Sequence, residues 1–390
     1  MTSEEKQFKY CTDCGAKNAK GAKFCKQCGT PFASNQSQAT THSERESHEE
    51  NRSSIMGSAT AKLNSWTGGH GEVKISLRNF FSEVFKKHTQ TEAEEIFIVG
   101  TPKTTPSIED VSVQEVHPWL FSRIFAFAIL LVILMYVLTT ANGRPGMFIA
   151  LTSVAAVVIP VSSLILFFEI NVLQNISFYK TVQMSFFGGV LSMLLVMSLD
   201  AVIPSGTGNI LASFGTGFTE ELSKVLIAAY FVNQVRARGI LNGLLIGSAV
   251  GAGFAAIENI IYSVNDETGT LLPLSSDIFR TVTSMGTHTE WCAISTVGLI
   301  IACAGKKLTF GDLLNIKFLR FFAVAVILHT IWDSGILSSQ DGTLTLPEII
   351  KYTSLIAIVW IVILVLIHAG LRGISELKRA KIGQKNVEKI

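Results

Sequence analysis

The feature that most limits how this chain can fold is a series of long apolar segments between residues 118 and 372. A helix needs about 20 mostly apolar residues to cross the hydrocarbon core of a bilayer. Segments of that kind lie near 118–141, 146–170, 178–203, 211–233, 240–264, 278–304, 316–338 and 349–371. The sequence therefore predicts an all-α polytopic membrane protein with about eight transmembrane helices.

The charges in the connecting loops predict the orientation of these spans. With the N-terminus inside, the outer loops contain Arg144 as their only basic residue. The inner connections carry Lys180, Arg236, Arg238, Lys306, Lys307, Lys317 and Arg320. Because basic loops stay on the cytoplasmic side, we expect an even number of spans with both termini in the cytoplasm. The N-terminal residues also lack the apolar stretch of a signal peptide.

The first part of the chain has a different composition. Residues 1–117 are polar and charged, although the whole chain is 48% hydrophobic and only 16% charged. The formal net charge of +2 gives no reason to expect a nucleic-acid partner. The bilayer is the expected surrounding of residues 118–372, and residues 373–390 form a basic tail predicted to be cytoplasmic.

Residues 9–33 have the pattern of a zinc ribbon. Two Cys-x-x-Cys pairs, Cys11 with Cys14 and Cys25 with Cys28, can supply four thiolates to one tetrahedral, structural Zn²⁺. Two disulfides are the alternative, which a reducing cytoplasm disfavours. The ribbon could bind a protein partner or only cap the segment that follows. Cys292 and Cys303, in one apolar run, are interpreted as core thiols.

Two segments connect the ribbon to the membrane domain. Residues 34–70 are rich in Ser, Thr, Glu, Asn and Gln, and their composition predicts a disordered linker. Within 71–117, residues 71–88 place apolar side chains at helical spacing and end in Lys86 and Lys87. This pattern predicts an amphipathic helix, lying either on the inner membrane surface or against the protein's own loops, followed by irregular linker.

Ionisable residues within four of the predicted spans are the candidate functional groups, because charge inside a bilayer is costly. The fourth span contains Glu220, Glu221 and Lys224, the fifth Glu258 and Asn259, the sixth His288, and the seventh His329 and Asp333. Counted from the outer ends of their spans, these Glu and His residues lie about six to ten residues deep. A shared depth on separate helices predicts one common site. The fifth span also has Gly243, Gly247 and Gly251 at four-residue spacing, which predicts close helix packing.

The motifs at these positions resemble a known family. The pattern EExxK at 220–224, FxxxEN at 254–259, a His at 288 and HxxWD at 329–333 is similar to that of the PrsW family. These are bacterial intramembrane proteases of the superfamily of CAAX prenyl proteases and bacteriocin-processing enzymes. The resemblance extends over roughly 118–372. It implies a transmembrane protease domain in a bacterial cell membrane, with a single-span membrane protein such as an anti-sigma factor as the substrate.

Roles for the candidate residues follow from peptide hydrolysis, which needs an activated water and a stabilised oxyanion. We expect Glu221 to act as the general base, with Glu220 assisting it or paired with Lys224, although the resemblance does not settle which carboxylate acts. His288 and His329 could donate hydrogen bonds to the oxyanion. Glu258 is also a predicted catalytic residue, and with Asn259 it could position water or substrate. The supporting residues are Lys224, Asn259 and Asp333, of which Asp333 could orient His329.

An active-site metal is left open by the sequence. Glu and neutral His are ordinary ligands of catalytic zinc, but no HExxH helix is present, which favours a metal-free glutamate mechanism. Two other functions would use the same residues. A transporter could relay protons or bind an ion through the buried acids, and a non-catalytic scaffold could use the zinc ribbon to recruit a partner.

Overall fold

The protein is mostly helical in a computed structural model that describes residues 8–10, 17–19, 22, 46–112, 116–142, 145–264, 283–338 and 345–387. The chain divides into two compact units, Met1–Ile55 and Met56–Ile390. In the first unit, β1 (Phe8–Tyr10) and β2 (Lys17–Ala19) pair antiparallel, with Tyr10 opposite Lys17. The four cysteines of the predicted zinc site lie outside the described residues.

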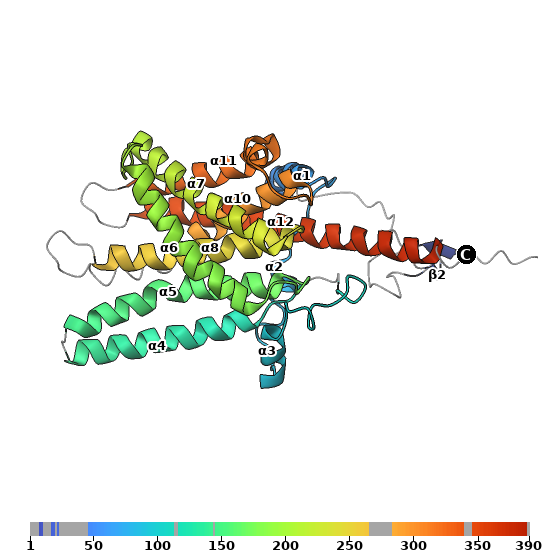
Figure 1. Ribbon diagram of the computed structural model, residues 1–390, viewed down its shortest axis with the longest axis horizontal. Helices are drawn as coiled ribbons and strands as arrows, with labels where there is room; N and C mark the ends of the chain where they lie inside the picture. Colours follow the sequence, from blue (N-terminus) through green and yellow to red (C-terminus); the bar gives the residue numbers. More distant parts are fainter. Residues whose placement is uncertain are drawn as a thin grey trace, which may run out of the picture. The chain divides into compact units, whose positions relative to one another are not determined.

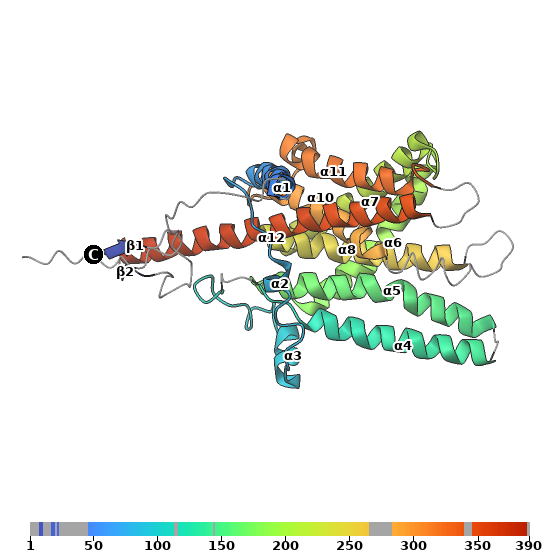
Figure 2. The same ribbon diagram turned by 180° about the vertical axis from the view of Figure 1, so that it is seen from behind.

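The helical elements follow one another along the chain in Figures 1 and 2. Before the long apolar helices come α1 (Glu46–Trp66), α2 (Leu77–Phe80) and α3 (Gln90–Phe97). The long helices begin with α4 (Leu120–Asn142), α5 (Pro145–Ile170), α6 (Phe178–Asp200), α7 (Ile210–Val235) and α8 (Ile240–Val264). Then come the 3₁₀ turn η1 (Ser284–Gly286), α10 (His288–Cys303), η2 (Phe310–Leu314), α11 (Ile316–Asp333) and α12 (Leu346–Val387).

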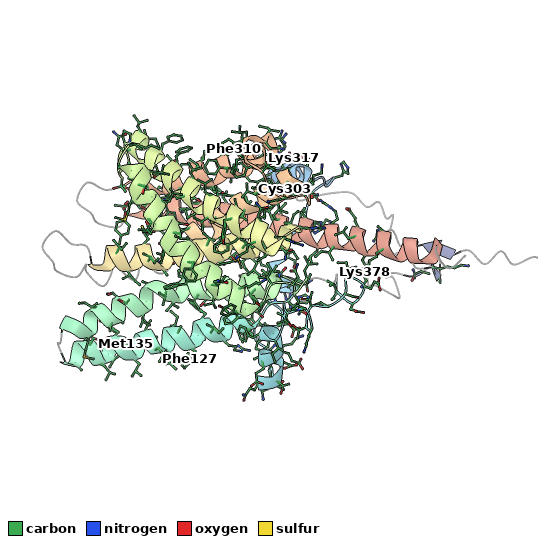
Figure 3. All side chains as sticks on the ribbon, in the orientation of Figure 1. Phe127, Met135, Cys303, Phe310, Lys317 and Lys378 are labelled. Carbon is green, nitrogen blue, oxygen red and sulfur yellow. The ribbon has the colours of Figure 1, made fainter. Side chains whose placement is uncertain are left out.

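Helix α8 is the central helix of the second unit. It packs against α5, α6, α7, α10 and α12, and 78% of its apolar stretch is buried by protein. By contrast, α4 lies at the edge of the bundle beside α5 (Figures 1 and 2), and only 6% of its stretch is buried. Phe127 of α4, labelled in Figure 3, is 63% exposed. The bundle therefore has an interior helix and a peripheral one of similar length.

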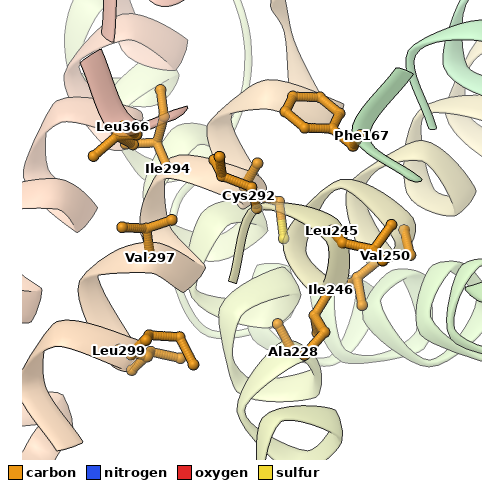
Figure 4. Packing of buried hydrophobic residues seen from close by; sticks show 14 of the residues in the cluster. Phe167, Ala228, Leu245, Ile246, Val250, Cys292, Ile294, Val297, Leu299 and Leu366 are labelled. Carbon is orange, nitrogen blue, oxygen red and sulfur yellow. The ribbon is translucent and has the colours of Figure 1, made fainter. Parts of the chain in front are cut away.

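The glycines of α8 let α10 approach closely. A Cβ at Gly247 would lie 2.4 Å from the carbonyl oxygen of Cys292, and one at Gly251 would lie 2.3 Å from that of His288. No side chain fits at either distance, so the predicted packing role of this glycine series is confirmed. Around the contact lies a continuous core (Figure 4) that includes Phe167 of α5, Ala228 of α7 and the buried free thiol of Cys292.

The number of membrane spans remains a prediction. In the described residues, five helices are long and apolar enough to cross a bilayer: α4, α5, α6, α8 and α12. The other predicted spans correspond to α7, α10 and α11: α7 and α11 carry several charged residues, and α10 is short. Helix α10 has 16 residues, so it is about 24 Å long and shorter than the hydrocarbon core.

The predicted disordered linker at 34–70 is wrong for its second half, because Glu46–Trp66 form α1. The end of this helix is held by contacts with distant residues. Trp66 meets the ring of Phe321 edge-on, with 5.5 Å between centroids, and Arg372 donates hydrogen bonds to the side chain of Asn64 and to the carbonyl of Thr67. The polar composition of the segment does not reveal these partners, since they lie about 300 residues further along the chain.

The predicted amphipathic helix over 71–88 is also shorter than expected, because only Leu77–Phe80 are helical. Ser76 caps its N-terminus, and the carbonyl of Asn79 lies 2.9 Å from Nδ1 of His117. Phe81 then packs against Phe121 at the start of α4, with ring centroids 5.9 Å apart. Contacts with the protein's own loops thus end the helix after one turn, which favours the second of the two predicted placements.

Candidate active site

Four helices bring the candidate residues together. Glu220 and Glu221 lie next to each other on α7 with Lys224 one turn later, Glu258 lies on α8, His288 on α10 and His329 on α11. All six are buried. The ring centroids of His288 and His329 are 5.0 Å apart, and their planes are nearly perpendicular. The structure therefore places every predicted catalytic residue in one cluster inside the bundle.

His288 reaches the cluster differently from the prediction. The sequence placed it about ten residues inside a span that began near 278. In the structure α10 begins at His288 itself, directly after η1, so this histidine lies in the first turn of its helix. Residues 265–282, which contain the expected first turns of that span, lie outside the described part of the chain.

Glu221 is held as an ion pair at the centre of the cluster. Its Oε1 lies 2.6 Å from Nζ of Lys224 and 2.9 Å from Nδ1 of His329, and the carboxylate and the ammonium are fully buried. Removing two charges from water is costly and is repaid only by close pairing of this kind. Because Glu221 and Lys224 both lie on α7, we infer that the contact of Glu221 with His329 is what fixes α7 against α11.

The Lys224 ammonium also determines the state of His288. Nζ lies 2.8 Å from Nδ1 of His288. Since an ammonium can only donate, Nδ1 must accept, and the ring proton of a neutral His288 belongs on Nε2. Nε2 lies 2.7 Å from Oε2 of Glu258. Lys224 and Glu258 thus hold the imidazole from its two sides.

His329 is fixed in a similar way. Its Nδ1 faces Glu221, and its Nε2 lies 3.2 Å from Oδ2 of Asp333, one helical turn later on α11. The indole of Trp291 stacks on the same imidazole, with 4.6 Å between ring centroids. Sequence reasoning did not single out Trp291, since an aromatic residue in an apolar span carries no signal of its own.

In the part of the chain that the structure describes, Glu220 and Glu221 each have a buried Oε2 without a hydrogen bond, but Glu221 makes the close ion pair with Lys224. Within the described residues, the buried Oε2 of Glu220 has no hydrogen-bond partner. Three nitrogen atoms nevertheless surround it, each at 3.7 Å: Nζ of Lys224, Nδ1 of His288 and Nε2 of His329. These distances are too long for hydrogen bonds and leave room for a small species between the atoms. An unsatisfied buried carboxylate oxygen is costly, so we expect something to bind there.

The same three side chains fit a metal ion. Glu220, His288 and His329 each offer a ligand atom, and these atoms lie within 4.8 Å of one another. Zinc binds such ligands at about 2.0–2.2 Å, which separates two tetrahedral ligand atoms by about 3.3–3.6 Å. The 3.7 Å between Glu220 Oε2 and each imidazole nitrogen is close to that separation. A cation bound at Nδ1 of His288 would displace the Lys224 ammonium, since one lone pair cannot serve both.

The remaining predicted residue, Asn259, has a different neighbour. Its side-chain amide donates to the backbone carbonyl of Ala156 on α5, with a nitrogen–oxygen distance of 3.2 Å. This hydrogen bond ties α8 to α5. None of the cluster's ion pairs described above includes Asn259.

Lys351 is a residue that sequence reasoning missed. Nζ of this buried lysine on α12 donates to the carbonyls of Trp332 and Ser334, at 3.4 and 3.1 Å. These carbonyls flank Asp333 at the end of α11. A cation at a helix C-terminus is stabilising, and here it also anchors the residue that contacts His329. A lone lysine within a predicted apolar span was the signal that could have identified it.

The fold and this cluster define a class of protein. A multi-pass membrane protein with carboxylates and imidazoles gathered inside its bundle has the groups needed for hydrolysis within the bilayer. In agreement, residues 173–367 match the PrsW family of intramembrane metalloproteases, and the chain belongs to this family. Residues 10–32 match a zinc-ribbon domain, as the cysteine spacing predicted. No curated protein and no solved structure matches the chain.

The family assignment identifies the protein as an intramembrane protease rather than a transporter or a non-catalytic scaffold. It also makes a metal-dependent reaction the family expectation, whereas the absence of an HExxH helix had favoured a metal-free one. The match runs from residue 173 to 367 and so includes α6 to α11 and about half of α12, but not α4 and α5. The family match therefore covers a shorter part of the chain than the resemblance expected over 118–372.

Proposed function

We propose that this protein cleaves a peptide bond in the membrane-anchored part of a single-span protein, such as an anti-sigma factor in a bacterial cell membrane. The observation that carries the proposal is the buried Oε2 of Glu220, which has three nitrogen atoms at 3.7 Å and no hydrogen bond. In the proposed orientation both termini are cytoplasmic, which follows from the basic inner loops.

The side chains that would hold a divalent cation, which we propose to be Zn²⁺, are Glu220, His288 and His329. When bound, such an ion acts as a Lewis acid that polarises the scissile carbonyl and activates water. Trp291 stacks on His329, and Glu221, itself held by Lys224, contacts Nδ1 of the same ring, so these residues orient the imidazole and link α7 to α11. Asp333 lies beside Nε2 of His329. These residues have positioning roles and need not contact the substrate.

Glu258 is the proposed proton acceptor. Its carboxylate is next to His288 Nε2 and is not part of the Glu221–Lys224 pair. It would take the proton of the attacking water and return it to the amide nitrogen that leaves. This differs from the sequence-based assignment of Glu221 as the base, because Glu221 already pairs with Lys224 and His329.

The test is cleavage of a single-span substrate by the purified protein in proteoliposomes. We expect Glu220→Gln and Glu258→Gln to lower the rate by about 10²-fold or more, since each removes a group needed for chemistry. Glu376→Gln is the matched control, because Glu376 is an exposed glutamate on α12 outside the cluster. Full activity of both cluster variants would refute the proposal.

The zinc content of the purified protein and its variants distinguishes the ribbon site from the proposed site in the helical bundle. We expect two zinc ions per chain in the wild type and one in each of two variants. Cys11→Ser with Cys14→Ser removes the ribbon ion, and His288→Ala removes the ion of the bundle. A wild-type protein with one zinc ion, which is lost with the ribbon cysteines, would favour the metal-free glutamate mechanism.

A further inference from the structure

A second polar site lies far from the catalytic cluster. A cavity of ≈ 410 Å³ is formed where α7 ends, where the chain turns into α8, and where α10 ends. The first lining residue on α7, Val232, is 11 residues beyond Glu221, which corresponds to about 16 Å of helix. The cavity is therefore separate from the active site.

The lining of this cavity is strongly cationic. It includes Arg236, Arg238, Lys306 and Lys307 but no carboxylate. All four side chains are exposed, and none forms an ion pair with an acidic residue in the described parts of the chain. Four like charges around one cavity repel one another, so an anion bound between them would be stabilised.

The two loops that carry these cations are held in fixed positions. Asn233 on α7 donates to the carbonyl of Leu308 and accepts from its N–H, at 3.0 and 2.9 Å. Helices α7 and α10 both end at a non-glycine residue in the left-handed region, Arg236 with φ of 53° and Ala304 with φ of 48°. The cavity is thus preformed, and a ligand would not have to order the loops.

The chemistry of the lining points to one ligand class. Arginine presents a planar fork of donors that matches phosphate oxygens, and lysine adds compact positive charge. Basic pockets between membrane helices at the cytoplasmic surface bind phospholipid headgroups. The basic loops place this cavity on the inner side of the predicted topology. We propose that it binds a phosphate group, supplied by the headgroup of an anionic phospholipid.

The experiment uses the full-length protein in nanodiscs of phosphatidylcholine alone or with phosphatidylglycerol. The quantities measured are the thermal unfolding midpoint and the lipid retained in native mass spectrometry. Arg238→Gln with Lys307→Gln removes half of the cavity's charge. Arg78→Gln with Lys87→Gln is the matched control, since it makes the same charge change at exposed residues outside the cavity.

We expect phosphatidylglycerol to raise the midpoint of the wild type and of the control, and the cavity variant to retain phosphatidylglycerol at least about tenfold more weakly. Equal retention by the cavity variant and the control would overturn the proposal. So would equal retention of phosphatidylcholine and phosphatidylglycerol by the wild type.

Inorganic phosphate at constant ionic strength, added to phosphatidylcholine nanodiscs, distinguishes the two sources of the ligand. Stabilisation of the wild type but not of the cavity variant would identify a soluble phosphate as the ligand and refute the lipid assignment. An absence of stabilisation by free phosphate, together with selective retention of phosphatidylglycerol, is the result that we expect.

Discussion

Helices α4 and α8 differ in a way that explains how this molecule is built. They have similar lengths, but α4 is more apolar, with a mean hydropathy of 2.6 against 1.8. The less apolar α8 is nevertheless the one buried by protein, at 78% against 6%. In a bilayer, lipid is as apolar as a protein core, so higher hydrophobicity alone gives a helix no reason to move inside.

The interior is instead occupied by helices that need protein neighbours. Helix α8 carries small residues that permit close contact, and α7, α10 and α11 carry charges that need partners. The family match includes these four helices and leaves out α4, although it also leaves out the largely buried α5. The chemistry therefore depends on the interior helices, and α4 mainly faces lipid.

Among substitutions that compare the interior helices with the peripheral α4, Lys224→Met should have the largest effect on stability and activity. It leaves the Glu221 carboxylate buried without its cation, which we expect to cost about 3–5 kcal/mol of unfolding free energy and to abolish cleavage. Glu221→Gln combined with Lys224→Met should recover much of the stability but none of the activity. Both quantities can be measured in nanodiscs by denaturant unfolding and substrate cleavage. A loss below about 1 kcal/mol in the single variant would contradict a buried ion pair.

The next effect tests the contact of α8 with α10. Gly251→Ala places a methyl group against the carbonyl of His288, so α10 must shift. We expect a loss of about 10²-fold in kcat, because displacements of about 1 Å at a reacting centre have that effect. Gly373→Ala is the control, since its Cβ would meet no atom within 4 Å. Equal rates in the two variants would show that α10 tolerates the shift.

A smaller effect is expected from Lys351→Met, which removes the cation from the end of α11. Outer partners of this kind typically contribute about tenfold or more to activity or metal affinity. We predict a lower kcat at unchanged KM, weaker zinc binding, and recovery of both by Lys351→Arg. Loss of stability without any change in kcat would restrict Lys351 to a structural role.

The smallest effect is predicted for α4. Phe127→Ala removes a large side chain that is 63% exposed, and we expect a change within about 0.5 kcal/mol in stability and no change in cleavage rate. The same measurements as for Lys224→Met apply. A loss above about 1 kcal/mol would mean that α4 packs against another protein surface, either a second copy or a partner.

Several properties of this protein were already determined by its sequence. Long apolar runs and paired Cys-x-x-Cys motifs are local patterns, and they predicted the membrane domain and the zinc ribbon. Charged residues on successive apolar runs predicted which helices meet, because a charge in a bilayer needs a partner.

Only the tertiary structure decided the finer arrangement. It placed His288 at the start of α10, brought Asn64 and Trp66 against α12 and α11, and gave Glu220 and Glu221 different surroundings. Adjacent glutamates on one helix point about 100° apart. Which of them pairs closely with the ammonium and with His329, and which lies at 3.7 Å from three nitrogen atoms, depends on how neighbouring helices are rotated and shifted. Those rotations come from packing contacts between distant residues, which no local pattern in the sequence records.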